Sequence, residues 1–311
     1  MANTAQTKHD KDAVAETTSS DLAEATATKK RRDTNNAFSE LMRPKRPKLD
    51  TPASTTGRHH NRFFAGSDGL GVYISDPAAH LMDGPAATAD GGSASGSRGS
   101  RVIFFTADFV AIHDLYPKAT VHCLLLPRDR RFNRQHPLEV LSRQSDEAAS
   151  RFLAGLRAAA EQLRTIVAAE LRRQLGAGSA QDAAREAFMR GEGMDEDGEG
   201  EVGGDPPPGR DWAAEVLVGV HAHPSMSHLH VHVLSRDMHS DRLRNSSHYN
   251  SFTTPFFVPL DAFPLAASDP RHSSDSLHQS MACWRCGRQF GNRFADLKRH
   301  LEQEFQAWKR E

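Results

Sequence analysis

The stretch of sequence that decides the fold is His228-Leu229-His230-Val231-His232-Val233-Leu234. Histidine alternates strictly with apolar residues, and this period of two is typical of a β-strand, whose successive side chains point to opposite faces. The three histidines are therefore predicted to share one face, while the residues between them fill the core on the other. Because each buried imidazole needs hydrogen-bond partners, three in register indicate a functional site rather than ordinary core polarity.

Two kinds of chemistry fit this row of histidines. Imidazole is a common zinc ligand and His-x-His pairs bind metals, but the motif contains no carboxylate to support such ligands. Imidazole can also attack phosphorus and then depart, which divides one hard displacement into two easier ones. The pattern favours this second interpretation, in which His230 attacks while its neighbours fix its tautomer and donate to phosphate oxygens. Ser225, in the turn before the strand, would add further donors.

The surrounding sequence predicts an α+β fold. Short apolar runs bounded by turn residues are expected as strands at 70–74, 101–106, 109–114, 121–126, 215–221 and 228–235. Their close spacing favours antiparallel pairing. Pro137 opens a stretch with apolar residues at helical spacing up to Val167, which predicts one long helix packed on the sheet.

Polar segments indicate where the folded part ends. Residues 1–57 lack apolar periodicity and are expected to be disordered, and their basic clusters at 29–32 and 43–48 suit nuclear import. Two insertions and a linker, rich in Gly, Ser, Pro or acidic residues, are expected at 83–100, 191–210 and 266–280. A catalytic domain is therefore expected over 58–265.

The composition narrows the class of protein further. The net charge of the 311 residues is −1, so the charge of the whole chain favours no partner. No apolar run reaches the roughly 18 residues of a membrane span, and no apolar region of a signal peptide begins the chain. With three cysteines a disulfide framework is not expected, which favours a reducing compartment and, with the basic clusters, the nucleus.

The last thirty residues predict a ββα-like zinc module over 281–311. Cys283 and Cys286 are spaced as in a zinc knuckle, and His300 and Glu304 lie four apart, so that both side chains reach the same ion. Without a metal these residues have almost no core, so one structural zinc ion is expected. Basic residues near the ligands indicate contact with DNA phosphates: Arg285, Arg288, Arg293, Lys298 and Arg299.

Together these motifs resemble the aprataxin branch of the histidine-triad (HIT) family. The similarity includes residues 218–234, Tyr116-Pro117-Lys118-Ala119 and residues 245–252, and the Cys-Cys-His-Glu set is similar to the finger of fungal aprataxins. The resemblance implies a HIT domain that removes AMP from adenylated 5′ ends of DNA through a covalent histidine–AMP intermediate. It also implies a structural zinc ion and no catalytic metal.

The resemblance assigns roles to single residues. His230 matches the nucleophile, His228 and His232 match the flanking triad members, and His221 matches a histidine that helps the DNA phosphate to leave. Further matches bind the nucleotide or phosphate: Asp114 at the ribose hydroxyls, Lys118 near the nucleotide, Ser225 and Met226 in the phosphate loop, and Arg244 at a DNA phosphate.

The implied partners are DNA with 5′-adenylated breaks, including RNA–DNA junctions, and AMP as the product, with the protein acting as a monomer away from membranes. Phe63 or Phe64 is expected either as an aromatic wedge that stacks on the terminal base or as a buried helix anchor. Two other functions stay open. A HIT hydrolase of free nucleotides, such as adenosine phosphoramidates or dinucleoside polyphosphates, would not need the finger. A non-enzymatic zinc-finger DNA-binding protein would not need the histidines.

Overall fold

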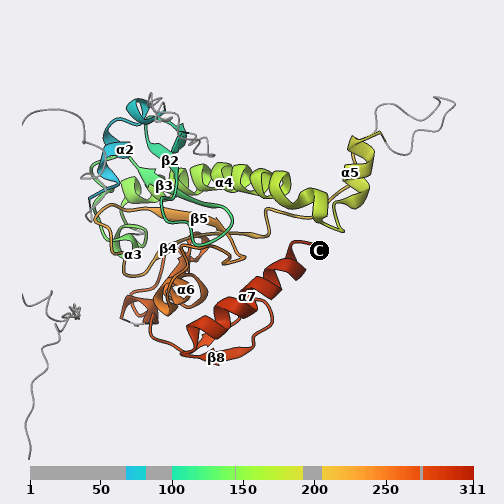
Figure 1. The fold of residues 1–311 in the computed structure, drawn as a ribbon. Coiled ribbons are helices and arrows are strands. Elements are labelled where there is room, and N and C mark those ends of the chain that lie inside the picture. Colours follow the sequence, from blue (N-terminus) through green and yellow to red (C-terminus); the bar gives the residue numbers. More distant parts are fainter. Residues whose placement is uncertain (1–67, 82–99, 144, 192–204, 274–275) are drawn as a thin grey trace, which may run out of the picture. The chain divides into compact units, whose positions relative to one another are not determined.

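The computed structural model describes residues 68–81, 100–143, 145–191, 205–273 and 276–311 (Figure 1). The N-terminal tail with both basic clusters, Phe63 and Phe64, and most of the two expected insertions lie outside the described residues. No helix within the described ranges is long and apolar enough to cross a membrane.

The centre of the fold is an antiparallel sheet of six strands in the order β1-β2-β3-β5-β4-β6. The strands are β1 Val102–Phe105, β2 Phe109–His113, β3 His122–Pro127, β4 Val216–His221, β5 Val231–Ser235 and β6 Phe257–Pro259. The predicted α+β class and antiparallel pairing are confirmed.

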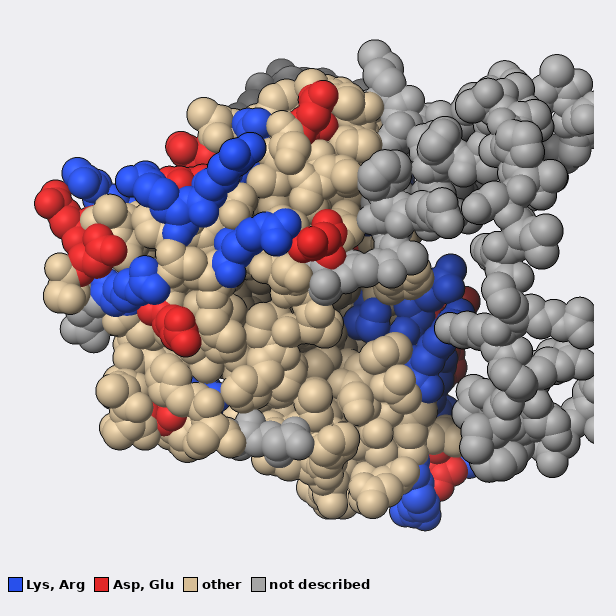
Figure 2. Space-filling model, turned by 90° about the vertical axis from the view of Figure 1, so that its left-hand side faces the viewer, with Lys and Arg blue, Asp and Glu red and all other residues tan. Residues whose placement is uncertain are grey.

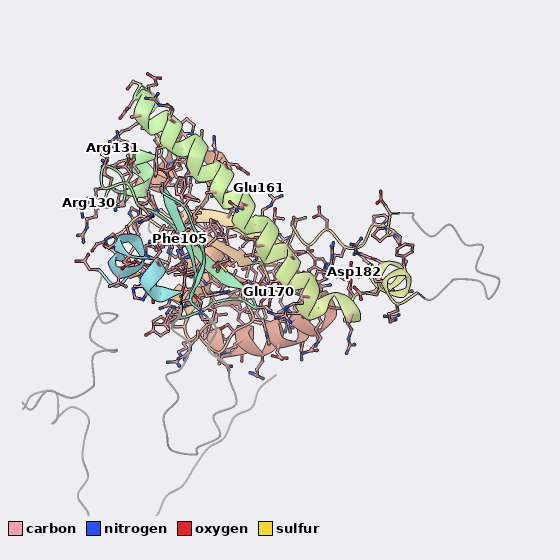
Figure 3. The ribbon with its side chains drawn as sticks, turned by 90° about the horizontal axis from the view of Figure 1, so that it is seen from above. Phe105, Arg130, Arg131, Glu161, Glu170 and Asp182 are labelled. Carbon is pink, nitrogen blue, oxygen red and sulfur yellow. The ribbon has the colours of Figure 1, made fainter. Side chains whose placement is uncertain are left out.

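The sheet has two different faces because side chains alternate along each strand. Val231 and Val233 of β5 point to the face that the long helix α4 (Glu147–Leu175) covers, together with Leu125 of β3. His232 and Leu124 point to the opposite face. Figure 3 shows α4 extending along the sheet, with Glu161 and Glu170 on this helix and Phe105 on the edge strand β1.

The strand expected at 70–74 is wrong, because these residues form the helix α2 (Gly71–Ser75). Its buried residues are Leu70, Tyr73 and Ile74. This spacing of three and one places the side chains on one side of a helix, whereas a strand would bury alternate residues. The helix covers β2 and β3 on the face opposite α4.

The single long helix expected from Pro137 is divided in two. A short helix α3 (Pro137–Val140) comes first, and α4 begins only after Asp146. The Asp146 side chain accepts hydrogen bonds from the backbone N–H groups of Ala148 and Ala149, which is the geometry of an N-cap. A new helix therefore begins there, with its own capping residue.

The strand that carries the histidines is shorter than expected. β5 begins at Val231, so His228 and His230 precede it. The partner strand β3 ends at Pro127, which has no backbone N–H to extend the ladder. The N–H of Leu229 instead donates to the carbonyl of Asn133 in the loop after β3.

The C-terminal residues form the expected ββα unit, with β7 Met281–Ala282, β8 Gln289–Gly291 and α7 Phe294–Trp308. Its apolar residues Phe290, Leu297 and Leu301 belong to the same buried cluster as Tyr249 and Phe252 of helix α6 (Ser246–Thr253). The finger and the sheet domain therefore share a hydrophobic core. The remaining helices are α5 Ala183–Met189 and the 3₁₀ turns Ala78–His80, Gly176–Gly178, Leu260–Ala262 and Pro270–His272.

A second connection to the finger is made by Arg210, which is 3% exposed. Its guanidinium lies against the rings of both Trp212 and Trp308, 4.4 and 4.7 Å from their centroids. It donates to the Trp308 carbonyl at 2.6 Å and to the Glu215 carboxylate at 3.0 Å. The end of α7 is thus fixed to the segment that leads into β4.

Candidate active site and zinc site

A pocket of about 370 Å³ opens on the face of the sheet opposite α4. Histidines, a carboxylate and a lysine line one part of it, and apolar side chains around Leu70, Tyr73 and Leu124 line another. Of the predicted site residues it collects Asp114, Lys118, His221, Ser225, Met226, His230 and His232. A site with an apolar end and a polar, histidine-rich end suits a nucleotide, with its base at the first and its phosphate at the second.

The tautomer of His230 is fixed by its own backbone. Its Nδ1 lies 2.7 Å from the carbonyl oxygen of His228. A carbonyl can only accept, so Nδ1 carries the proton and Nε2 keeps its lone pair. Burial lowers the pKa of His230, which keeps the ring neutral. The residue therefore has the protonation state of a nucleophile.

A chain of hydrogen bonds fixes the tautomer of His232. The backbone N–H of Lys118 donates to Nδ1 of His122 at 3.2 Å, so the proton of the neutral His122 ring is on Nε2. That nitrogen lies 3.0 Å from Nδ1 of His232, which must accept. The proton of His232 is therefore on Nε2, which has no hydrogen-bond partner among the described residues. A donor is thus available in the pocket for an oxygen of a bound phosphate.

His122 was missed by the sequence reasoning, although it is 4% exposed and lines the pocket. It is the first residue of β3 and follows Asp114 after the loop that joins β2 to β3. The distance between its Nε2 and the Asp114 carboxylate is 3.6 Å. Burial lowers its pKa to about 4. The only available signal was a polar residue at the edge of an otherwise apolar strand.

The histidines pack closely on one another and on an aromatic ring. The ring centroid of His221 lies 4.2 Å from that of His232 and 4.8 Å from that of Phe252. Burial, reinforced by His230 and His122, lowers the pKa of His221 to about 3. The pKa of His232 is also lowered, first by burial and then by His221. Each ring is therefore neutral near pH 7.

Charged groups lie at one side of the pocket. The Asp114 carboxylate accepts the N–H of Tyr116 at 2.7 Å, and the Lys118 amino group donates to the Tyr116 carbonyl. Burial raises the pKa of Asp114, but His122, this backbone N–H and Lys118 outweigh it and lower the pKa. The pKa of Lys118 is lowered by burial and, in part, by Arg242 and Arg244. A carboxylate and a group of cations therefore stand side by side at this site.

Two predicted site residues are not among those that line the pocket. His228 is buried under α2, where a Cβ atom on Gly71 would come within 3.1 Å of its ring, and its Nδ1 is 4.0 Å from Asp68. It contacts His230 through its backbone carbonyl. Arg244 is exposed, and its backbone N–H donates to His248. Only His232 lies within β5, but Leu229 packs with Val231 and Val233 on the side of α4, while His228 lies under α2 on the opposite face. The three histidines therefore share one face, as expected.

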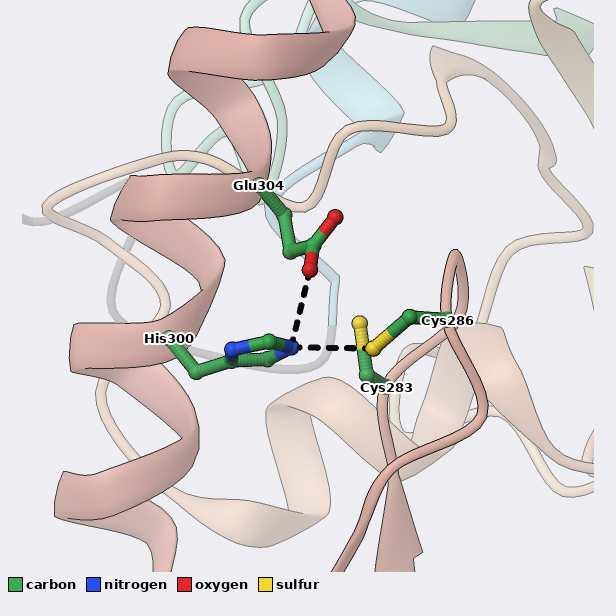
Figure 4. Close-up of side chains that lie close together, drawn as sticks. All are labelled: Cys283, Cys286, His300 and Glu304. Atoms are coloured by element: carbon green, nitrogen blue, oxygen red, sulfur yellow. Dashed lines mark hydrogen bonds and ion pairs between the residues drawn. The ribbon is translucent and has the colours of Figure 1, made fainter.

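The four residues predicted as zinc ligands come together in the finger (Figure 4). Their potential ligand atoms all lie within 4.8 Å of one another. Nε2 of His300 is 3.1 Å from the Cys286 sulfur and 3.2 Å from Oε1 of Glu304. Two thiols, one imidazole and one carboxylate make a complete tetrahedral donor set for Zn²⁺, so the residues fit a structural zinc site.

Arg285 supports the glutamate of this site. Its Nη1 lies 2.5 Å from Oε2 of Glu304, while Oε1 of the same carboxylate faces His300. Its other nitrogen pairs with Glu311. Two thiolates and one carboxylate would give a zinc complex a net charge of −1, which the guanidinium compensates. Arg285 is therefore engaged by Glu304 of the zinc site and by Glu311, and its expected contact with a DNA phosphate stays a prediction.

The other cations of the finger differ in how they are engaged. Lys298 donates to the Leu243 carbonyl at 3.1 Å, and Arg293 and Arg299 both pair with Asp296. Arg288 lies over the Phe290 ring. Figure 2 shows lysine and arginine side chains gathered on the face that it draws, with acidic residues among some of them.

Comparison with known proteins gives two family matches. Residues 96–239 match the HIT domain, and residues 253–307 match the C2HE / C2H2 / C2HC zinc-binding finger. An aprataxin-like protein of Schizosaccharomyces pombe is 30% identical over 281 residues, which are 88% of this chain and 95% of that protein. The aprataxin-like protein of Saccharomyces cerevisiae is also 30% identical, over 66% of this chain and 88% of its own.

Solved structures of aprataxin orthologs are similar to this chain as well. The crystal structure of the aprataxin ortholog Hnt3 in complex with DNA is 28% identical to this chain, with a TM-score of 0.54, and the match covers 78% of this chain and 96% of that one. Hnt3 in complex with DNA and guanosine matches over the same shares with a TM-score of 0.53.

Proposed function

The chain belongs to the family of aprataxin-like proteins, and from this membership we propose that it hydrolyses AMP from adenylated 5′ ends of DNA. Its HIT domain and zinc finger define a DNA-processing hydrolase at the coarse level. The substrate class and the histidine–AMP intermediate are the finer parts of the proposal. Support for DNA comes from a relative of 28% identity whose structure was solved with DNA bound.

The observation that carries the proposed chemistry is the protonation state of the pocket. His230 presents an unprotonated Nε2, because its Nδ1–H is used by the His228 carbonyl. His232 offers an Nε2–H without a partner among the described residues. An electron-pair donor and a proton donor in one pocket are the two groups that an in-line attack on phosphorus requires.

In the proposed first step, Nε2 of His230 forms a bond to the phosphorus of AMP. The bond from this phosphorus to the bridging oxygen breaks, and the DNA leaves with its 5′-phosphate and the bonding electron pair. His232 donates a hydrogen bond to a phosphoryl oxygen, and His221 beside it favours the departure of the DNA phosphate. Water then cleaves the P–N bond and releases AMP, with no metal taking part in either step.

The remaining site residues would bind the substrate. Asp114, whose carboxylate lies 3.6 Å from His122, accepts from the ribose hydroxyls. Lys118 lies near the nucleotide, Ser225 and Met226 contact the phosphates from their loop, and Arg244 meets a DNA phosphate. The zinc finger adds a basic surface that reads no base sequence, as suits a monomeric nuclear enzyme that accepts breaks of any sequence, RNA–DNA junctions included.

The test is AMP release from a nicked duplex that carries a 5′-adenylate, with adenosine 5′-phosphoramidate as the free-nucleotide comparison. We expect fast release from the DNA and much slower turnover of the free nucleotide. A protein that ignores the adenylated nick but cleaves the phosphoramidate would keep the HIT chemistry and contradict the DNA assignment. Failure on both substrates would leave a zinc-finger binding protein.

A further inference from the structure

Helix α6 has the catalytic pocket on one side and the zinc finger on the other. Ser247, His248, Ser251 and Phe252 line the pocket. The residues between them, Tyr249 and Asn250, are 0% and 1% exposed and face the segment that leads into the finger. One turn of helix thus separates the two sites.

The Tyr249 hydroxyl holds the backbone on both sides of a zinc ligand. It donates to the carbonyl of Ala282 at 2.8 Å and accepts the N–H of Trp284 at 2.9 Å, and Cys283 lies between these two residues. The Asn250 amide adds two bonds, to the carbonyls of Leu277 and Gln279, both at 2.8 Å. Buried backbone groups that lose such partners are destabilised, so the knuckle and α6 fix each other.

Phe252, three residues after Tyr249 and on the pocket side of the helix, contacts the histidines of the pocket. The centroid of the Phe252 ring lies 4.8 Å from that of His221, 5.1 Å from His232 and 5.4 Å from His122. Tyr249 and Phe252 are three positions apart and are therefore neighbours on the helix surface. Both belong to the buried cluster that also contains Cys283.

We propose that α6 couples the zinc site to the catalytic pocket, with the Tyr249 hydroxyl as the connection. Small zinc modules are ordered with their metal and relax without it, so zinc binding supplies the two states that a coupling needs. With zinc bound, the backbone around Cys283 holds Tyr249, and Phe252 is held against the histidines. When zinc leaves, the hydroxyl loses two partners and this wall of the pocket loosens.

The coupling predicts an effect that a finger acting only as a DNA grip does not have. AMP occupies the pocket without DNA, so its affinity should depend on zinc only if the finger acts through the fold. This choice of ligand rests on the proposed function, in which AMP is the product. Tyr249→Phe removes the connecting oxygen and keeps the ring in the core. Thr253→Val is the matched control, because the Thr253 hydroxyl donates to the Tyr249 carbonyl within the same helix and makes no bond to the finger among the described residues.

The experiment measures the AMP dissociation constant by calorimetry for the full chain, zinc-loaded and zinc-stripped, in the wild type and both variants. Competition with a chelator gives the zinc affinity.

We expect zinc removal to weaken AMP binding to the wild type about 3- to 10-fold, the range that one or two lost hydrogen bonds produce. Zinc-loaded Tyr249→Phe should show a similar loss and bind zinc several-fold more weakly. Because both changes break one connection, their effects should not add. Thr253→Val should behave as the wild type.

A wild-type AMP affinity that ignores zinc would overturn the coupling, as would fully additive effects of zinc removal and Tyr249→Phe. AMP release from the adenylated nick, measured on the same wild-type sample, separates the two proposals. Normal release with zinc-independent AMP affinity removes the coupling alone. No release from the nick with zinc-dependent AMP affinity removes the proposed substrate and leaves the coupling.

Discussion

Two clusters of side chains among the described residues could hold a metal by distance alone, and they differ in how their ligand atoms are already used. One is Asp114, His122 and His232 in the pocket, and the other is Cys283, Cys286, His300 and Glu304 in the finger. In the pocket, backbone N–H groups donate to Asp114 and to Nδ1 of His122, and the other nitrogen of His122 is bonded to His232. In the finger, Nε2 of His300 contacts both the Cys286 sulfur and Oε1 of Glu304, and Arg285 holds the other oxygen of Glu304.

Short distances between potential ligand atoms do not by themselves define a metal site. The finger supplies two thiols, which favour zinc strongly, and a carboxylate whose outer oxygen is held by Arg285. The pocket supplies imidazoles whose protons are ordered by hydrogen bonds, so a metal there would have to displace them. Imidazole side chains thus have their protons ordered by hydrogen bonds in the pocket, whereas in the finger His300 stands among three other potential zinc ligands.

The largest effect should follow from removing the proposed nucleophile. His230→Ala should lower AMP release from an adenylated nick by about a thousand-fold or more, because the other pocket groups assist a displacement that no longer has its attacking nitrogen. Rapid-quench assays under single turnover measure this rate. DNA affinity is the control and should be unchanged. A rate of AMP release by His230→Ala within ten-fold of the wild type would contradict the proposed role of His230 in the pocket.

Zinc removal should act next most strongly, and on the finger. Structural zinc sites contribute about 10–16 kcal/mol of binding energy to folding, so a strong chelator should lower the melting temperature, and Cys283→Ala/Cys286→Ala should reproduce this. DNA affinity should fall about 10- to 100-fold if the finger makes several phosphate contacts. Elemental analysis of the wild type should give one zinc per chain. Two zinc ions per chain would mean that the pocket also binds an ion, which would contradict the distinction between the two clusters.

Removing His122 tests the ordering of protons in the pocket. His122→Leu leaves Nδ1 of His232 buried without its donor, so we expect a loss of about 10- to 100-fold in AMP release, the range for an unsatisfied buried polar group. His113→Leu, on the neighbouring strand and outside the pocket lining, is the control and should change release less than two-fold. Equal behaviour of the two variants would show that His232 does not depend on His122.

The smallest effect is the dependence of stability on pH. The pKa values of His122 and His221 are lowered to about 4 and about 3, so the unfolded chain binds protons that the folded chain excludes. Their contribution is complete above the unfolded pKa of about 6.5 and is lost as the pH falls toward the folded values. Urea unfolding should give about 2–3 kcal/mol less stability at pH 5.5 than at pH 7, roughly 1.2 kcal/mol for each of the two histidines. His122→Leu should show a shallower slope than the wild type, and an equal slope would contradict the assignment.

Much of the fold followed from local patterns in the sequence. Short apolar runs bounded by turn residues located β1 to β5, and ligand spacing located the zinc site and its ββα unit. The errors arose where contacts with residues distant in the sequence determine the secondary structure or the end of a strand. Leu70 to Ile74 is too short a run to separate a helix from a strand by its apolar content alone. The end of β3 at Pro127, far away in the sequence, determines where β5 begins.

The site was predictable in part for the same reason. The motif identified His230 and His232, but the tautomer of His232 depends on His122 and on a backbone N–H at Lys118, which only the folded sheet brings together. Likewise the sequence placed the finger after a linker at 266–280, a boundary that stays a prediction. The structure shows Ser276 buried in that range and hydrogen bonds from Asn250 to the carbonyls of Leu277 and Gln279.

In the proposed reaction, His230 carries AMP covalently, and the zinc finger takes no part in forming or breaking the bonds to AMP. The most direct measurement uses a nicked duplex with a radiolabelled 5′-adenylate, mixed with excess protein and quenched in alkali, where a histidine P–N bond survives. We expect label on the peptide that contains His230 in the wild type and in Cys283→Ala/Cys286→Ala, and no label in His230→Ala. Label on another residue, or AMP release by His230→Ala at the wild-type rate, would contradict it.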